Sequence, residues 1–226
     1  MSQPFYVAPE QVMKDRADYA RKGIARGRSL IASTYAEGVV ICAENTSNTL
    51  RKVSEIYDRI GFAGVGKYNE FDQLRIAGIR HADLKGFNYS RADVDARSLA
   101  NQYANMLGQV FTHEMKPMEV EILVAEIDEE EPERDQLFHI LYDGSVTDHT
   151  DHVVLGGDSD AIRERLTAGW SAGADLSAVV QLLVSSLAGE ERELVADDLE
   201  VAALTRGNGR RCFHRIEGEE LTNLLA

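Results

Sequence analysis

The sequence predicts an α+β protein in which two antiparallel sheets stack face to face and helix pairs cover their outer faces. Strand-like runs come in pairs joined by short turns, as in antiparallel hairpins. Helical patterns also come in pairs, and they separate three groups of strands along the chain. This order differs from the strict alternation of strand and helix that builds a parallel sheet, so we expect hairpin sheets with outer helices.

The first expected helix covers residues 9–22 and follows an extended arm of residues 1–8. Pro9 suits the first helical turn because proline has no N–H to lose there, and Glu10 favours the positive end of the helix dipole. Gly23 is expected to end this helix. No linker rich in proline, glycine or serine divides the rest of the chain, so we expect one domain over residues 9–226.

The remaining elements follow from apolar runs and helical spacing. Strands are expected at 29–35, 39–43, 53–57, 61–66, 120–127, 137–142, 152–155, 199–204 and 212–216. Helices are expected to start near Tyr68, Leu99, Ile162 and Leu176, and a short last helix is expected to end at Leu225. The acidic runs 128–135 and 190–200 are expected to be solvated loops, and 148–152 a solvated turn.

Composition narrows the class of protein. The chain has 226 residues, of which 44% are hydrophobic and 27% charged, as in globular domains. Its net charge of −14 argues against a nucleic-acid footprint and against a polybasic membrane patch. The first residues lack a secretory signal pattern, and no run approaches 18 apolar residues. We therefore expect a cytoplasmic protein that binds neither nucleic acid nor membrane.

No metal and no cofactor are expected. Cys42 and Cys212 are far apart and lack CxxC spacing, so they predict neither a disulfide framework nor a zinc site. His149 and His152 have ligand-type side chains, but the sequence places no third ligand beside them. The pair Gly156-Gly157 lacks the pattern of a phosphate-binding loop.

Four blocks of the sequence carry a family resemblance. They read YARKGIARGRSLIASTYAEGVVICAEN (19–45), RKVSEIYDRIGFAGVGKYNEFDQLRIAGIRHAD (51–83), RSLANQYANMLGQVFTHEMKPMEVEILVAEID (97–128) and LYDGSV (141–146). In this order they resemble the alpha subunit of the actinobacterial proteasome core particle, over nearly the whole chain. The resemblance implies a four-layer αββα sandwich of the N-terminal-nucleophile hydrolase type, which agrees with the layers expected from the pattern.

The resemblance also implies that the chain is not itself a protease. Related beta subunits use an N-terminal threonine, freed by autocleavage, as the nucleophile and its own amine as the base. Here Arg28 stands at or next to that position and no Gly-Thr junction precedes it, although Lys52 matches the beta-subunit lysine. We therefore expect no catalytic residue. The alternatives are a self-processing N-terminal-nucleophile hydrolase that starts at Ser29, and a scaffold unrelated to proteolysis.

Lys52 is expected to bind the carboxylate of a partner. In the family this lysine lies in a pocket between neighbouring ring members and receives the C-terminal tail of a ring-shaped AAA ATPase. By the same resemblance, the backbone of Gly27 approaches the tail and Lys67 lies on the other wall. An ammonium is a compact donor for a carboxylate, and partial burial strengthens the pair. The alternative for Lys52 is a solvated surface lysine.

The N-terminal arm is expected to act as a gate. In the family these arms converge on the ring axis and close the entry pore, and the matching residues here are Pro4, Phe5, Tyr6 and Val7. Proline stiffens such an arm, and the three apolar side chains can pack against neighbouring copies. The alternative is a frayed terminus. The implied partners are other copies of the chain in a heptameric ring, a ring of beta subunits holding the threonine proteases, and the AAA ATPase that unfolds tagged proteins.

Overall fold

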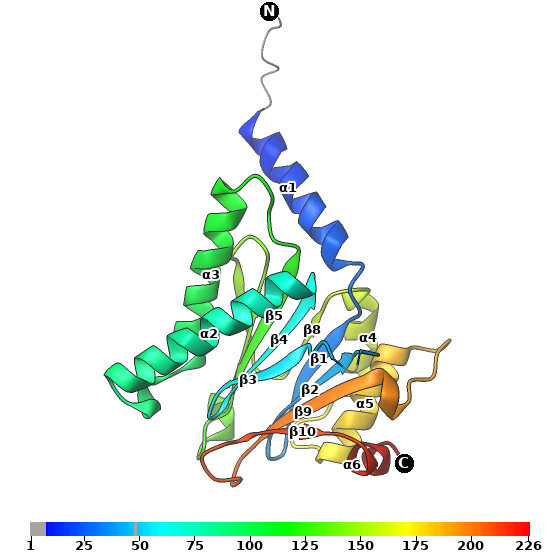
Figure 1. Cartoon of the computed structure of the whole chain (residues 1–226). Helices are drawn as coiled ribbons and strands as arrows, with labels where there is room; N and C mark the ends of the chain where they lie inside the picture. The colour runs from blue at the N-terminus through cyan, green and yellow to red at the C-terminus, as the bar shows by residue number, and fades with distance from the viewer. Residues whose placement is uncertain (1–7, 48) are drawn as a thin grey trace, which may run out of the picture.

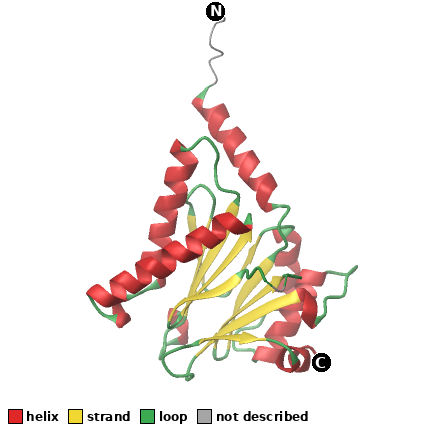
Figure 2. Ribbon diagram, in the orientation of Figure 1, coloured by secondary structure: helices red, strands yellow, loops and turns green. Residues whose placement is uncertain are grey.

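The structure, a computed structural model, describes residues 8–47 and 49–226. Two five-stranded antiparallel sheets form its two middle layers, and helices cover both outer faces (Figures 1 and 2). The predicted α+β architecture with stacked sheets is confirmed. The predicted gate residues Pro4, Phe5, Tyr6 and Val7 lie outside the described residues.

One sheet, here called the β1 sheet, has the strand order β10-β9-β2-β1-β8. Its strands are β1 (Leu30–Tyr35), β2 (Gly38–Glu44), β8 (His152–Leu155), β9 (Leu199–Thr205) and β10 (Phe213–Ile216). The first two form the predicted hairpin, in which Leu30 pairs with Ala43 and two residues make the turn. Strand β2 is buried along its whole length because it lies in the middle of a sheet that is covered on both faces.

The other sheet, here called the β5 sheet, has the strand order β3-β4-β5-β6-β7. Its strands are β3 (Val53–Tyr57), β4 (Ile60–Gly66), β5 (Val120–Glu126), β6 (Gln136–Ile140) and β7 (Val146–His149). The turn predicted for 148–152 is wrong in part, because Asp148 belongs to strand β7 and pairs with Phe138 of β6. Backbone pairing forms this edge strand, and its mostly exposed side chains leave no apolar pattern in the sequence.

Six α-helices complete the described structure. They are α1 (Pro9–Ile24), α2 (Tyr68–Asn88), α3 (Ala96–His113), α4 (Ser159–Gly169), α5 (Leu176–Ala188) and α6 (Glu219–Leu225). Three short 3-10 turns lie between other elements, at Arg91–Asp93, Pro132–Arg134 and Ala196–Asp198. Helices α2 and α3 pack on the β5 sheet, while α4 and α5 pack on the β1 sheet and α6 packs on α5.

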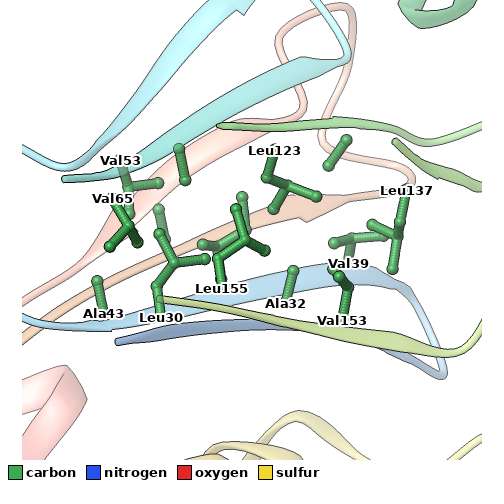
Figure 3. Packing of buried hydrophobic residues seen from close by; sticks show 14 of the residues in the cluster. Leu30, Ala32, Val39, Ala43, Val53, Val65, Leu123, Leu137, Val153 and Leu155 are labelled. Carbon is green, nitrogen blue, oxygen red and sulfur yellow. The ribbon is translucent and has the colours of Figure 1, made fainter. Parts of the chain in front are cut away.

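Three buried clusters correspond to the three boundaries between the four layers. The cluster between the sheets joins Leu30, Ala32 and Val39 of one sheet to Val53, Val65 and Leu123 of the other (Figure 3). A second cluster lies between the β5 sheet and helices α2 and α3, and a third lies between the β1 sheet and helices α4 to α6. Burial of apolar side chains at these three boundaries holds the ends of the strands in fixed positions.

Helix α1 begins at Pro9 as predicted but does not end at Gly23. It continues to Ile24, which is buried together with Ala20. A Cβ on Gly23 would lie 2.2 Å from Glu119 Oε1, so Gly23 permits a close approach within the helix instead of ending it. The first turns of α1 project away from the sheets (Figure 1).

Two acidic residues that the sequence places in solvated loops are buried. Asp135 is 6% exposed and forms an ion pair with Arg206, and Glu200 is 4% exposed and forms one with Arg215. Each carboxylate is buried because a guanidinium from another segment compensates its charge. The loop prediction is therefore wrong at these two positions.

Cys42 and Cys212 are both buried and free. In the part of the chain that the structure covers, none of the helices is long and apolar enough to cross a membrane. Nor do the described His, Cys, Asp and Glu side chains include a group of three or more suited to a metal ion.

Candidate functional site

Three segments meet at one end of the stacked sheets: the entry to β1, the entry to β3 and the exit from β4. Lys52 directly precedes β3, and its carbonyl oxygen accepts a hydrogen bond of 3.1 Å from Gly64 N of β4. Gly27 and Arg28 lie between α1 and β1. Lys67 follows β4 and stands at the N-cap of α2. The antiparallel pairings of the two hairpins therefore bring the sequence-predicted residues to the same end of the molecule.

The ammonium of Lys52 bonds to a neutral acceptor. Its Nζ donates a hydrogen bond of 2.6 Å to the carbonyl oxygen of Arg28. Burial lowers the pKa of Lys52 to about 8, while the charges of Glu44 and Glu200 oppose that lowering. Below pH 8 the site therefore holds a partly desolvated cation that a carbonyl, but no carboxylate of the described residues, contacts directly.

The carboxylate of Glu200 is held by four donors. Its Oε2 accepts from Lys52 N at 2.8 Å and from Asn45 Nδ2 at 2.8 Å. Its Oε1 accepts from Val53 N at 3.2 Å and from Arg215 Nη1 at 2.9 Å. This buried carboxylate fixes the backbone at the entry to β3, and it directs its oxygens to the Lys52 amide rather than to the ammonium.

The carboxylate of Glu44, at the end of β2, is held by two arginines. Arg28 Nη1 bonds to Oε1, and Arg192 Nη1 lies 3.0 Å from Oε1 and 3.2 Å from Oε2. Arg192 belongs to the connection between α5 and β9, and its Nη2 also donates to the carbonyl oxygen of Leu187 at 2.7 Å. A segment distant in the sequence thereby joins the surroundings of Lys52.

Gly27 lies against the end of β4. A Cβ added to Gly27 would fall 3.0 Å from Val65 Cγ1 and 3.1 Å from Gly66 N, so a side chain here would push on the backbone beside Lys67. Gly27 N also donates to the carbonyl oxygen of Ile24 at 2.8 Å, which closes the turn between α1 and β1. The structure therefore places Gly27 between the two predicted lysines.

Lys67 is half-exposed and only loosely paired. Its Nζ lies 3.8 Å from Glu70 Oε1, an oxygen to which Lys116 Nζ donates at 2.7 Å. The other oxygen of Glu70 accepts from Glu119 N at 2.7 Å. Among the described residues no hydrogen bond or ion pair joins Lys67 to Lys52, so the two cations are connected through the pairing of β3 with β4 and through the segment that contains Gly27 and Arg28.

Ser29, the start point of the self-processing alternative, is buried at the entry to β1. Its carbonyl oxygen accepts a hydrogen bond of 3.1 Å from Glu44 N, and its side chain lines a cavity of about 400 Å³ beside α4 and α5. In the described structure, Lys52 Nζ bonds to the carbonyl oxygen of the preceding residue and not to the Ser29 hydroxyl.

Sequence reasoning missed the residues that hold the two carboxylates. Glu200 and Arg192 both fall in a run predicted to be a solvated loop, and Arg215 lies in a strand without a recognisable motif. Arg192 and Glu44 are 148 positions apart, and no local pattern links positions so distant. The only signal in the sequence was a glutamate at the end of a strand that is expected to be buried. A buried carboxylate requires a cation, and no cation stands next to it in the sequence.

Comparison with known proteins gives one consistent result. Residues 24–202 match the family model described as "Proteasome subunit". A "Proteasome subunit alpha" of Acidimicrobium ferrooxidans is 61% identical over 225 residues, covering 100% of this chain and 97% of the relative. Proteins of the same description from Sanguibacter keddieii and Thermobifida fusca are 54% and 50% identical, each across 100% of this chain and at least 90% of the relative.

Proposed function

Because the chain belongs to the family of proteasome alpha subunits, we propose that its Lys52 site receives the C-terminal carboxylate of a ring-shaped AAA ATPase. Alpha subunits are non-catalytic components of the proteasome core, and gating is one of their general roles. The proposed assembly is a heptameric ring of this chain stacked on a ring of beta subunits, which hold the threonine proteases. In it, residues 1–8 close the entry pore and the docked ATPase delivers unfolded substrate.

The observation that supports the docking site is the neutral contact of Lys52. An ammonium bonded to the Arg28 carbonyl gains a stronger, charge-assisted hydrogen bond when a carboxylate replaces that carbonyl. The partly buried position makes this gain larger than it would be at an exposed lysine. Gly27 supports the site indirectly, because a side chain there would press on Val65 and Gly66 and would shift the segment that presents the Arg28 carbonyl to Lys52.

Lys67 supports the same site as a second cation. Its side chain is 51% exposed, and the carboxylate nearest to it is already bound by Lys116 and by a backbone N–H. Together the two lysines give this end of an anionic chain a local positive charge. Such a charge steers an incoming carboxylate, and mobile salt weakens the effect.

The test is docking of the ATPase ring from the same organism onto the assembled core, measured by its retention on immobilised particles. We expect Lys52→Ala to weaken docking about tenfold or more, the loss typical of removing one partner of a desolvated charge pair. Arg163→Ala is the matched control, because Arg163 is an exposed cation on α4 paired with Asp160. Unchanged docking by Lys52→Ala, with the particle still assembled, would reject Lys52 as the receptor.

A further inference from the structure

Two carboxylates lie near Lys52, but neither contacts its ammonium. Glu44 and Glu200 are the acidic groups that act most strongly on the Lys52 charge. Within the described structure, the acceptor that Lys52 Nζ bonds to is the carbonyl oxygen of Arg28. A partly buried ammonium beside two carboxylates ordinarily forms an ion pair with one of them, so other groups must hold these carboxylates away from it.

Glu200 is kept away by its own donors. Both of its oxygens accept two hydrogen bonds each, from Arg215 and Val53 N on one side and from Asn45 and Lys52 N on the other. A carboxylate with four donors offers no further lone pair at good geometry. The charge of Arg215 also compensates that of Glu200.

Glu44 is the carboxylate that could move to Lys52. Its backbone N–H donates to the carbonyl oxygen of Ser29, and Lys52 Nζ bonds to the carbonyl oxygen of the adjacent Arg28. Glu44 and Lys52 therefore both contact the segment of Arg28 and Ser29, and the Glu44 carboxylate bonds to the Arg28 side chain. Arg28 bonds only to Oε1 of Glu44, whereas Arg192 contacts both oxygens. Without Arg192, Oε2 has no donor among the described residues.

We propose that Arg192 is a positioning residue for the docking site: it holds the Glu44 carboxylate and thereby leaves the Lys52 ammonium for the carboxylate of the partner. This inference rests on the proposed docking function. Arg192 suits the role because its guanidinium bonds to Glu44 and to the Leu187 carbonyl at once, which fixes it between two segments. Glu44 is 4% exposed, so in the native arrangement its carboxylate depends on protein donors and not on water.

The first readout is the titration of Lys52 within the full chain, followed through ¹³C-methyl groups placed on its six lysines. Lys52→Arg assigns the signal. In Arg192→Ala we expect the midpoint to rise by about one pH unit or more, because Glu44 then pairs with the ammonium. In Glu44→Gln/Arg192→Ala no carboxylate is left to move, and the midpoint returns to the native value or below it. Arg192→Lys retains a cation for Glu44 and keeps the midpoint within a few tenths of native.

The second readout is docking of the same ATPase ring onto assembled particles. Arg192→Ala weakens docking about tenfold, and Glu44→Gln/Arg192→Ala restores it to within about twofold. A residue needed only for folding would not be rescued by a second substitution in its partner. Arg163→Ala, with a side chain as exposed as that of Arg192, leaves both readouts unchanged.

Two results overturn the inference: a Lys52 midpoint that does not rise in Arg192→Ala, or a midpoint that rises while docking is unaffected. The proposed function fails separately, when Lys52→Ala docks normally. In that case the titration still decides whether Arg192 keeps Glu44 away from Lys52.

Discussion

The hydroxyl of Tyr103 on α3 occupies the space that a side chain on Gly78 of α2 would need. A Cβ built on Gly78 falls 1.7 Å from the Tyr103 oxygen, so α2 and α3 approach each other at a point where only glycine fits. That hydroxyl is buried and has no hydrogen-bond partner among the described residues. The Tyr103 side chain therefore joins the two helices by packing on the bare backbone of Gly78, without a polar contact.

Gly78→Ala is expected to lower the free energy of unfolding by about 1–3 kcal/mol, because the added methyl group overpacks the contact with Tyr103. Tyr103→Phe removes the obstructing oxygen and should recover part of that loss. Urea unfolding of the single and double variants measures both effects. Gly108→Ala on the same helix pair is the control, because its Cβ would meet only an ordinary contact at 3.5 Å. An equal loss in Gly108→Ala would contradict the steric explanation.

Docking of the ATPase is expected to weaken as the pH rises through about 8. Only the ammonium form of Lys52 offers a charged donor, and its pKa in the free chain is about 8. Affinity should be nearly constant below pH 7 and about tenfold weaker at pH 9 than at pH 7. In Lys52→Arg the side chain stays charged, so whatever docking remains should not depend on pH in this range. Retention of the ATPase at a series of pH values measures both.

Arg206→Ala is expected to lower the free energy of unfolding by about 3–5 kcal/mol. Arg206 is the guanidinium that pairs with buried Asp135, and its Nε also donates to the Asp128 carbonyl at 3.0 Å. Burial already raises the pKa of Asp135, so loss of its partner leaves a costly charge. Asp135→Asn in the same background should recover part of the loss. The exposed pair of Arg134 and Glu131 serves as a comparison, where Arg134→Ala should cost less than about 1 kcal/mol.

Deletion of residues 2–8 is expected to raise peptide hydrolysis by particles assembled with the beta subunit. An arm that closes a pore limits the entry of small substrates, and its removal leaves the pore open at all times. Hydrolysis of a short fluorogenic peptide measures the change, and particles with inactivated beta subunits give the background. Equal rates for full-length and shortened chains would show that the arm does not limit entry.

Ser29→Ala is expected to leave the peptidase activity of the assembled particle unchanged. The side chain is buried at the entry to β1 and its backbone is fixed by Glu44 N. The intact mass of the purified chain should correspond to a chain that is uncut between Arg28 and Ser29. A mature chain that starts at Ser29 would favour the self-processing alternative.

The sandwich could be predicted from the sequence because paired strand runs and paired helices leave few arrangements that bury every apolar face. Strand β7 could not be predicted from the sequence. Its side chains are mostly exposed and show no alternation of apolar and polar residues, and backbone hydrogen bonds to β6 form it. The continuation of α1 past Gly23 depends on burial of Ile24, which is a tertiary contact.

The candidate site was predictable only in part, and by resemblance. Lys52, Gly27 and Lys67 were found through the family, whereas the buried state of Glu200 and the bond from Arg192 to Glu44 connect positions that are distant in the chain. Acidic composition near both residues favoured a solvated loop. Only the folded arrangement of β2, β9 and the α5–β9 connection reveals that these charges are paired.

The pairing of β2 with β9 has a consequence for the order in which the protein matures during synthesis. Strands β3 to β7 are contiguous in the chain and can associate before the C-terminal part leaves the ribosome. Strand β2 can pair early with β1, but its other edge must wait for β9. Glu200 and Arg192 arrive with that late segment, so the surroundings of Lys52 are completed last. A chain that terminates before this segment can bury its β5 sheet and still lack the residues that hold Glu44 and the Lys52 backbone in the proposed docking site.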